Sequence, residues 1–230
     1  MKTLSVSKSA WLIGLIVLAL AQSACNYATQ LIGGAPALQS GTPAPASCAN
    51  KYTSAKNGAT RIFVGASGYT EQATLSNLDT SSFDVDWQTN PVNGQKASFS
   101  DQWICTTAGL VMVGSSHQKF SSETGVTVPA SIKAGDHWTQ YFETVVTTFT
   151  DNYTAIGEES VTVPAGTFTA MKIQFSSVSQ GKSSGNSVML KTDGFEWWAA
   201  GIGNIKSSLT YTTDKTTTQI NRELQSYSNP

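Results

Sequence analysis

The sequence predicts an all-β protein, an antiparallel meander that forms a single domain as a strongly curved sheet or a partly open barrel. Three observations predict this class. Only 13% of the 230 residues are charged and Thr and Ser are abundant, which favours strands over solvated helices. From Asn57 onward turn residues recur roughly every 8 to 14 positions, as they do between short strands. After Cys48 no long stretch has the 3.6-residue period of an amphipathic helix.

The N-terminal residues 1–24 are predicted to be a signal peptide. Two lysines precede an uninterrupted apolar run at positions 11–21. A helix that spans a bilayer needs about 20 apolar residues, so this run is too short to cross a membrane. Two cleavage points are open: after Ala21, at an Ala19-x-Ala21 site, or directly before Cys25.

Cys25 is the candidate for lipidation. The residues before it resemble a bacterial lipobox, with a departure at Gln22, where the pattern usually has an apolar or small residue. The following segment, 25–47, is predicted to be a disordered linker, because its Gly, Pro, Ala and Ser residues cannot bury a core. The predicted partner of this end of the chain is a membrane, on the extracytoplasmic side of the bacterial cell envelope. The β-rich domain then covers residues 48–230.

The number of cysteines supports this assignment. The chain has three, and an odd number in an oxidising compartment leaves one thiol unpaired. If Cys25 carries a lipid, Cys48 and Cys105 remain as an even pair, and export makes a disulfide between them the prediction. The alternative is two unpaired buried thiols.

Alternation of apolar and polar residues predicts individual strands at Phe83–Trp87, Met171–Phe175 and Ile205–Thr212. The pentapeptide Val-Thr-Val-Pro-Ala occurs twice, at 126–130 and at 161–165. Proline cannot donate a hydrogen bond to a neighbouring strand, so each copy is predicted to end a strand and to begin a turn.

Two motifs resemble a known group of proteins. The runs VTVPAGTF at 161–168 and WWAAGIGNIK at 197–206 are similar to those of uncharacterised bacterial exported β-rich proteins and lipoproteins. In that group a VPAGTF strand start is followed by a hairpin of this second type. Ala200 stands where that group more often has proline. The resemblance spans roughly residues 57–212 and implies a β-rich envelope domain, akin to the half-open barrels that carry lipoproteins and lipids. It implies no catalytic residue.

A search for catalytic, metal-binding and cofactor-binding motifs finds none that the context supports. His117 and His137 lack the further ligands that a zinc site needs. The run 181–185 matches G-x-S-x-G, but it is polar and precedes no helix. Asp84 and Asp86 share one strand face and are better explained as its solvated side. We therefore predict a non-enzyme without metal or cofactor, and a net charge of −1 excludes nucleic acid as a partner.

Aromatic residues are the one surplus that points to binding. Alternation places Trp197 and Trp198 on opposite faces of one strand, so at least one of them faces solvent or a concavity. Glu196, beside this pair, is a carboxylate that could border a cleft. The predicted ligand-lining residues are Trp87, Trp103, Trp138 and Trp198.

The first functional hypothesis is a non-catalytic envelope lipoprotein that holds an apolar or amphiphilic ligand, or an envelope protein, in a concave sheet face. The second is a structural or adhesion module whose Thr-rich edge strands, such as Thr212–Thr218, pair with other chains or with glycans. The third is a hydrolase, which is weakest because no nucleophile is accompanied by a base.

Overall fold

The computed structural model describes residues 48–53, 56–65, 68–91, 95–116, 118–183 and 186–229. The predictions for the signal peptide, for lipidation of Cys25 and for the linker fall outside these residues, as does His117. The described chain consists of strands without an α-helix, which confirms the all-β class. In this part of the chain, no helix has the length and apolar character needed to cross a membrane.

The described residues form fourteen strands. The strands are β1 (Thr60–Gly65), β2 (Thr70–Ser76), β3 (Ser82–Asn90), β4 (Ala97–Thr106), β5 (Gly109–Ser115), β6 (Gln118–Lys119), β7 (Ser122–Gly125), β8 (Val128–Pro129), β9 (His137–Glu143), β10 (Thr147–Val163), β11 (Gly166–Ser183), β12 (Asn186–Ala199), β13 (Gly203–Thr212) and β14 (Thr217–Ser228). The shortest of them, β6, β7 and β8, lie between the fifth and ninth.

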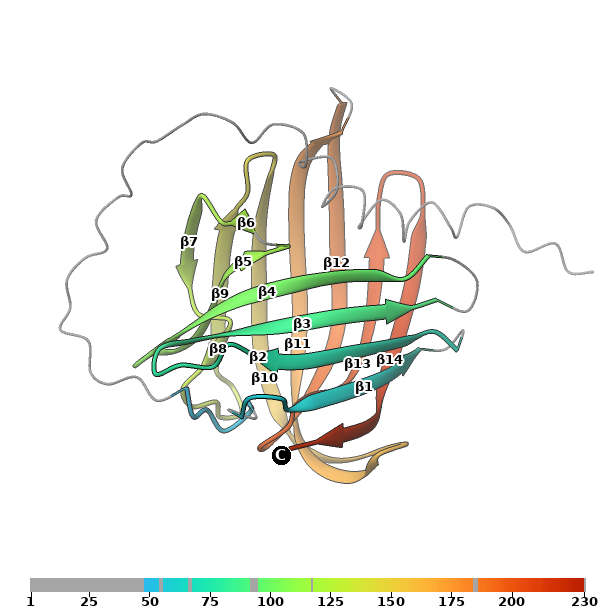
Figure 1. The fold of residues 1–230 in the computed structure, drawn as a ribbon. Helices are drawn as coiled ribbons and strands as arrows, with labels where there is room; N and C mark the ends of the chain where they lie inside the picture. The colour runs from blue at the N-terminus through green and yellow to red at the C-terminus, as the bar shows by residue number, and fades with distance from the viewer. Residues whose placement is uncertain are drawn as a thin grey trace, which may run out of the picture. The chain divides into compact units, whose positions relative to one another are not determined.

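All strands belong to one antiparallel sheet with the order β6-β5-β4-β3-β2-β1-β14-β13-β12-β11-β10-β9-β7, and β8 pairs with β5. The pairing of β1 with β14 joins the meander of the first strands to that of the last. Figure 1 shows β1–β4 crossing the longer β10–β14, so the sheet folds over on itself. This is the strongly curved sheet of the prediction, with a meander on each side of the β1–β14 pair.

The backbone ladder does not close into a barrel, but side chains connect its two ends. β6 and β8 pair with β5, whereas β7 pairs with β9. Gln140 on β9 is fully buried and donates a hydrogen bond to the Met112 carbonyl of β5 at 3.3 Å. It also accepts one from the Thr127 hydroxyl at 2.9 Å. A buried amide that both donates and accepts is satisfied here without water, and it holds the two sheet edges together.

Burial follows the alternation predicted from sequence. Along β13 the residues from Gly203 to Leu209 alternate between buried and half-buried, and Phe83 and Val85 of β3 are buried while Asp84 is half-buried. The second Val-Thr-Val-Pro-Ala copy ends β10, and Pro164 begins the turn to β11. In the first copy, β8 ends at Pro129. Both prolines therefore end strands, as their missing N–H requires.

The core divides into two clusters. The larger includes Phe63, Leu75, Ile205, Leu224 and Trp197. The smaller is rich in aromatic residues and consists of Tyr52, Ile132, Tyr153, Ala155, Met171, Ile173 and Trp198, with Val128, Trp138 and Phe175 packed against it. Trp197 and Trp198 thus belong to different clusters, and both are buried. Neither ring faces solvent, because the Lys172 and Lys206 side chains lie over Trp197 and Trp198 packs against Trp138.

The predicted disulfide joins Cys48, where the described domain begins, to Cys105 at the end of β4. Their Cα atoms are 5.1 Å apart and both residues are buried. The bridge closes a loop with a sequence separation of 57. In the chain-entropy model a loop of this size stabilises the fold by about 4 kcal/mol.

Candidate functional site

A row of polar side chains crosses the inner face of the sheet, defined here as the face of β9–β14 that carries the core residues Tyr153 and Ile173. Residues that are paired across neighbouring strands project to the same face. The register pairs Asp151 with Gln140 on one side and with Ser177 on the other. Ser177 in turn pairs with Thr192, and the pairing continues through Tyr211 to Thr218, across six strands. We call this set the polar row: Gln140, Asp151, Ser177, Thr192, Tyr211 and Thr218.

The row of side chains next to the polar row is mainly apolar. It contains Tyr153, Phe175, Leu209 and Ile220 in register. Within the polar row, by contrast, Gln140, Asp151 and Thr192 are buried at 0%, 8% and 6% exposure. Burying polar groups is unfavourable unless they are hydrogen-bonded, so each requires a partner.

Asp151 lacks one of its partners. Its Oδ2 accepts a long hydrogen bond from the Tyr153 hydroxyl at 3.5 Å. Its Oδ1 is buried and has no partner among the described residues. Burial raises the pKa of Asp151 to about 6, the Ser177 hydroxyl opposes this rise, and the nearby charge of Glu196 adds to it. The carboxylate is therefore poised to accept a hydrogen bond or a proton.

On the other side of the apolar row lies a charged pair. Arg222 of β14 contacts Glu71 of β2 at 3.1 Å, and its Nε donates to the Ser207 hydroxyl at 3.1 Å. The guanidinium also lies over the rings of Phe63 and Trp87, 4.8 and 5.4 Å from their centroids. Burial alone lowers the pKa of Arg222, but the charges of Glu71 and Glu196 outweigh it and the net shift is upward. Arg222 is therefore charged and held in place.

Glu196 lies in the same row as Arg222 through its pairing with Ser207. Its carboxylate accepts a hydrogen bond from the Trp198 indole at 2.9 Å, and burial raises its pKa. The charge of Arg222 opposes that rise. The carboxylates of Glu71 and Glu196 thus act on Arg222, and the charge of Glu196 also acts on Asp151.

The structure separates the four predicted ligand-lining tryptophans. Trp87 stacks between Phe63 and Phe99 and donates to Asp101 at 2.8 Å. Trp103 stacks on Phe83. These two pack against the larger core cluster.

The other two tryptophans lie together. The ring centroids of Trp138 and Trp198 are 6.1 Å apart, and Trp138 stacks on Tyr153 at 5.1 Å. Trp138 is half-buried, whereas Trp198 is buried with its indole bonded to Glu196. That any of the four contacts a ligand stays a prediction.

Sequence reasoning missed Asp151, Glu71 and Arg222. Asp and Asn are typical of turns, but Asp151 and Asn152 both lie inside β10. Strong turn formers are tolerated within a long strand when both neighbours supply a complete ladder, as β9 and β11 do here. No local signal marks Glu71 and Arg222, because they meet only through the pairing of β1 with β2 and β14.

The other sequence candidates have local partners. Asp84 accepts from the Asn77 amide at 2.7 Å, and Asp86 accepts from the Ser76 hydroxyl. His137 is exposed and bonded to Thr154 at 2.9 Å. Among the described residues, no three His, Cys, Asp or Glu side chains are placed to hold a metal.

The Thr-rich stretch Thr212–Thr218 forms the hairpin between β13 and β14. Thr212 pairs with Thr217, and β13 and β14 pair with each other. The pairing of β14 with β1 covers only Arg222–Ser228. Residues 217–221 therefore have a partner strand on one side among the described residues.

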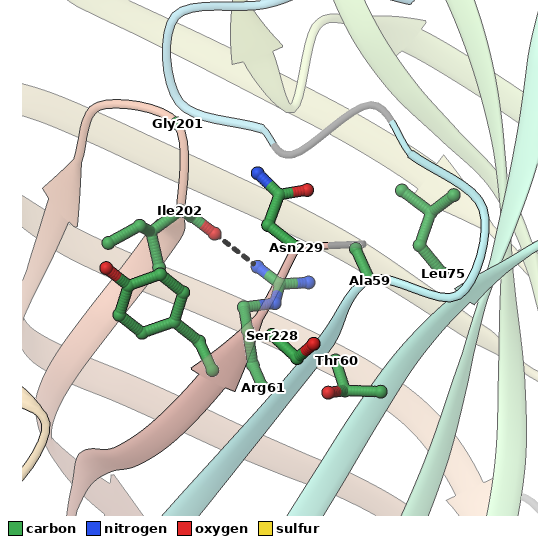
Figure 2. A pocket seen from close by; sticks show the side chains of 9 residues that line it. Ala59, Thr60, Arg61, Leu75, Gly201, Ile202, Ser228 and Asn229 are labelled. Carbon is green, nitrogen blue, oxygen red and sulfur yellow. Dashed lines mark hydrogen bonds between the residues drawn. The ribbon is translucent and has the colours of Figure 1, made fainter.

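Two hollows lie away from the polar row. A small pocket of about 10 Å³ surrounds Arg61 (Figure 2). A shallow cleft of about 380 Å³ lies at the turn between β9 and β10, where Val145 is 90% exposed.

Comparison with known proteins places this chain near one protein family. A family model described as DUF3108-like matches residues 142–227. The matched segment runs from β9 into β14 and includes Asp151, Glu196 and Arg222. No curated protein matches the chain significantly.

Two solved structures resemble the described domain. One is a candidate lipoprotein from Parabacteroides distasonis, with a TM-score of 0.50 and 13% identity over 78% of this chain and 99% of that chain. The other is a candidate exported protein with a YmcC-like fold from Bacteroides fragilis, with a TM-score of 0.51 and 14% identity over 78% and 100%. At such low identity the likeness shows the fold alone, and the domain shares the YmcC-like fold.

Proposed function

We propose that this protein is a non-catalytic lipoprotein of the bacterial cell envelope, anchored through Cys25, whose inner sheet face binds an amphiphilic ligand. Export is supported by the predicted signal peptide and by the names of the two similar structures, one a candidate lipoprotein and one a candidate exported protein. The VTVPAGTF and WWAAGIGNIK motifs, which resemble those of exported proteins, both lie inside the DUF3108-like match.

The observation that carries the binding proposal is the buried Oδ1 of Asp151, which accepts no complete hydrogen bond from the described residues although the Ser177 hydroxyl lies near the carboxylate. A buried acceptor without a donor costs about 1 to 3 kcal/mol, and a sheet face that served only for packing would have an apolar residue here. A ligand that donates a hydrogen bond to Oδ1 removes this cost. Ser177 and Tyr211 in the same row are half-buried and provide further hydroxyls along the path.

The charge and the apolar surroundings define the ligand class. The charge of Glu196 acts on Asp151, and no cation pairs with Asp151 among the described residues, which favours a cationic amine as the polar end. The adjacent row offers Phe175, Leu209 and Ile220 to an alkyl chain. We therefore propose an amphiphile with an amine or another donor at one end and an apolar chain beside it.

The test compares two probes of equal chain length, dodecylamine and dodecanoate, below the concentrations at which they form micelles. The protein is a Cys25→Ser form, and calorimetry gives the dissociation constants. We expect tighter binding of the amine and a loss of roughly tenfold or more in Asp151→Asn, because a hydrogen bond to a charged group contributes roughly 1.5 to 3 kcal/mol. Asp84→Asn, on the half-buried outer side of β3, is the matched control and keeps wild-type affinity. Equal affinity of wild type and Asp151→Asn for the amine would contradict the proposal.

A further inference from the structure

Arg61 of β1 lies at the centre of a small pocket. The pocket has a volume of about 10 Å³. Figure 2 shows the Arg61 guanidinium between the turn of Gly201 and Ile202 and the end of β14 at Ser228 and Asn229. Ala59, Leu75 and Ile202 contribute apolar walls. A space of this size admits roughly one water-sized group.

The described residues supply no counterion to the Arg61 guanidinium. Its Nη1 donates one hydrogen bond, to the Ile202 carbonyl at 3.2 Å. No carboxylate forms an ion pair with it among the described residues, whereas Arg222 is paired with Glu71. A guanidinium has five N–H donors, so most of its capacity remains available. Desolvation by burial and, to a lesser extent, the charge of Arg222 lower the pKa of Arg61 to about 10, so the group still carries its charge at neutral pH.

The surrounding turn is built to let the guanidinium approach. Gly203 has φ +96°, and a Cβ at this position would come within 2.7 Å of Arg61 Nη1 and 2.8 Å of the Tyr52 carbonyl oxygen. The turn is fixed by a hydrogen bond from the Gly201 N–H to the Lys51 carbonyl at 2.7 Å. The Ile202 carbonyl and the close approach of Gly203 thus hold the Arg61 side chain in place, so the pocket around it is preformed.

From this geometry we propose that the Arg61 pocket binds the carboxylate end of a small molecule or peptide. A planar guanidinium recognises a carboxylate through two parallel hydrogen bonds, and the apolar walls strengthen that attraction by excluding water. The hydroxyls of Thr60 and Ser228 line the same space. Only part of the carboxylate enters, because the volume is small, and the remainder of the ligand lies over the exposed residues Tyr227, Ser228 and Asn229. This site is independent of the Asp151 proposal and favours the opposite charge.

The first test is thermal unfolding of the Cys25→Ser protein in sodium formate, sodium acetate or sodium chloride at equal ionic strength. A ligand that binds only the folded state raises the melting temperature in a saturable manner. We expect formate to raise it more than chloride does. In Arg61→Gln the dissociation constant for formate weakens by about tenfold or more, because the charge-assisted hydrogen bonds are lost. Lys56→Gln, which removes an exposed cation outside the pocket lining, retains the full effect.

Two further readouts keep the proposal testable if Arg61→Gln folds poorly. Arg61→Lys preserves the charge without the planar fork, and we expect intermediate affinity for formate. In the wild-type protein, the line width of ¹³C-formate in NMR should broaden saturably and be restored by acetate but not by chloride. Equal effects of formate and chloride, or an undiminished formate effect in Arg61→Gln, would overturn the proposal. Comparing free formate with a peptide that ends in a C-terminal carboxylate then distinguishes a small-molecule ligand from a peptide ligand.

Discussion

Replacing Gly194 with alanine is expected to lower the free energy of unfolding by about 3 kcal/mol, because the added methyl group has no space. Gly194 lies in β12 within the apolar row of the inner face, paired with Phe175 and Leu209. At its φ of +155° a Cβ would come within 2.1 Å of the Ser208 carbonyl oxygen and 3.0 Å of the Leu209 Cα. Both atoms belong to the backbone of β13, so relief requires the two strands to separate.

The matched control for this substitution is Gly157→Ala. Gly157 has the same φ of +155°, but a Cβ there would meet no atom within 4 Å. The two variants therefore share the backbone strain and differ in the steric overlap alone. Urea unfolding, with equal m-values as the check on two-state behaviour, should show a loss of about 1 kcal/mol for Gly157→Ala and a much larger loss for Gly194→Ala. Equal losses would mean that the close approach of β12 and β13 is not a constraint.

The stability of the domain is expected to fall as the pH rises from about 4 to about 6, and Asp151 is the group responsible. Its pKa is raised from 3.8 to about 6 in the folded state, chiefly by burial. Below pH 4 the carboxyl is neutral in both states and carries no penalty. Above pH 4 the unfolded chain ionises first, so the folded state is progressively disfavoured, by about 3 kcal/mol once the pH exceeds 6.

Urea unfolding at a series of pH values measures this effect. In Asp151→Asn the decline between pH 4 and pH 6 should be largely removed, and the variant should be more stable than wild type at pH 7. Asp101, Glu123 and Glu196, whose pKa values burial also raises, contribute a residual slope of the same sign in both proteins. An Asp151→Asn protein that shows the full wild-type decline would assign the slope to another group.

The strands were predictable because their signal is a local alternation of residues, and the disulfide was predictable because it follows from the number of cysteines. Alternation in Phe83–Trp87 and Ile205–Thr212 reports directly which side chains are covered. The pairing of Cys48 with Cys105 followed from the number of cysteines and the expected compartment. The folding of the sheet over itself was only partly predictable, because it depends on the pairing of β1 with β14, which are far apart in sequence.

The candidate site was predicted less well, for a physical reason. The tryptophans were chosen because large aromatic residues often line binding surfaces, yet Trp198 is buried and donates to Glu196. The polar row exists only through strand register, which aligns Asp151, Ser177 and Thr192 on three neighbouring strands. A shift of one residue in any pairing would turn these side chains to the other face, and sequence alone does not fix that register.

The central claim is that the inner face carries an amphiphilic ligand, and native mass spectrometry tests it most directly. The Cys25→Ser protein is exported to an oxidising compartment, purified gently and sprayed beside its Asp151→Asn variant. We expect an additional mass on the wild-type protein that dissociates on activation, belongs to an amine-bearing amphiphile and is depleted in the variant. Wild-type protein at its bare mass that also fails to take up added dodecylamine, or an adduct equally abundant in Asp151→Asn, would contradict the account.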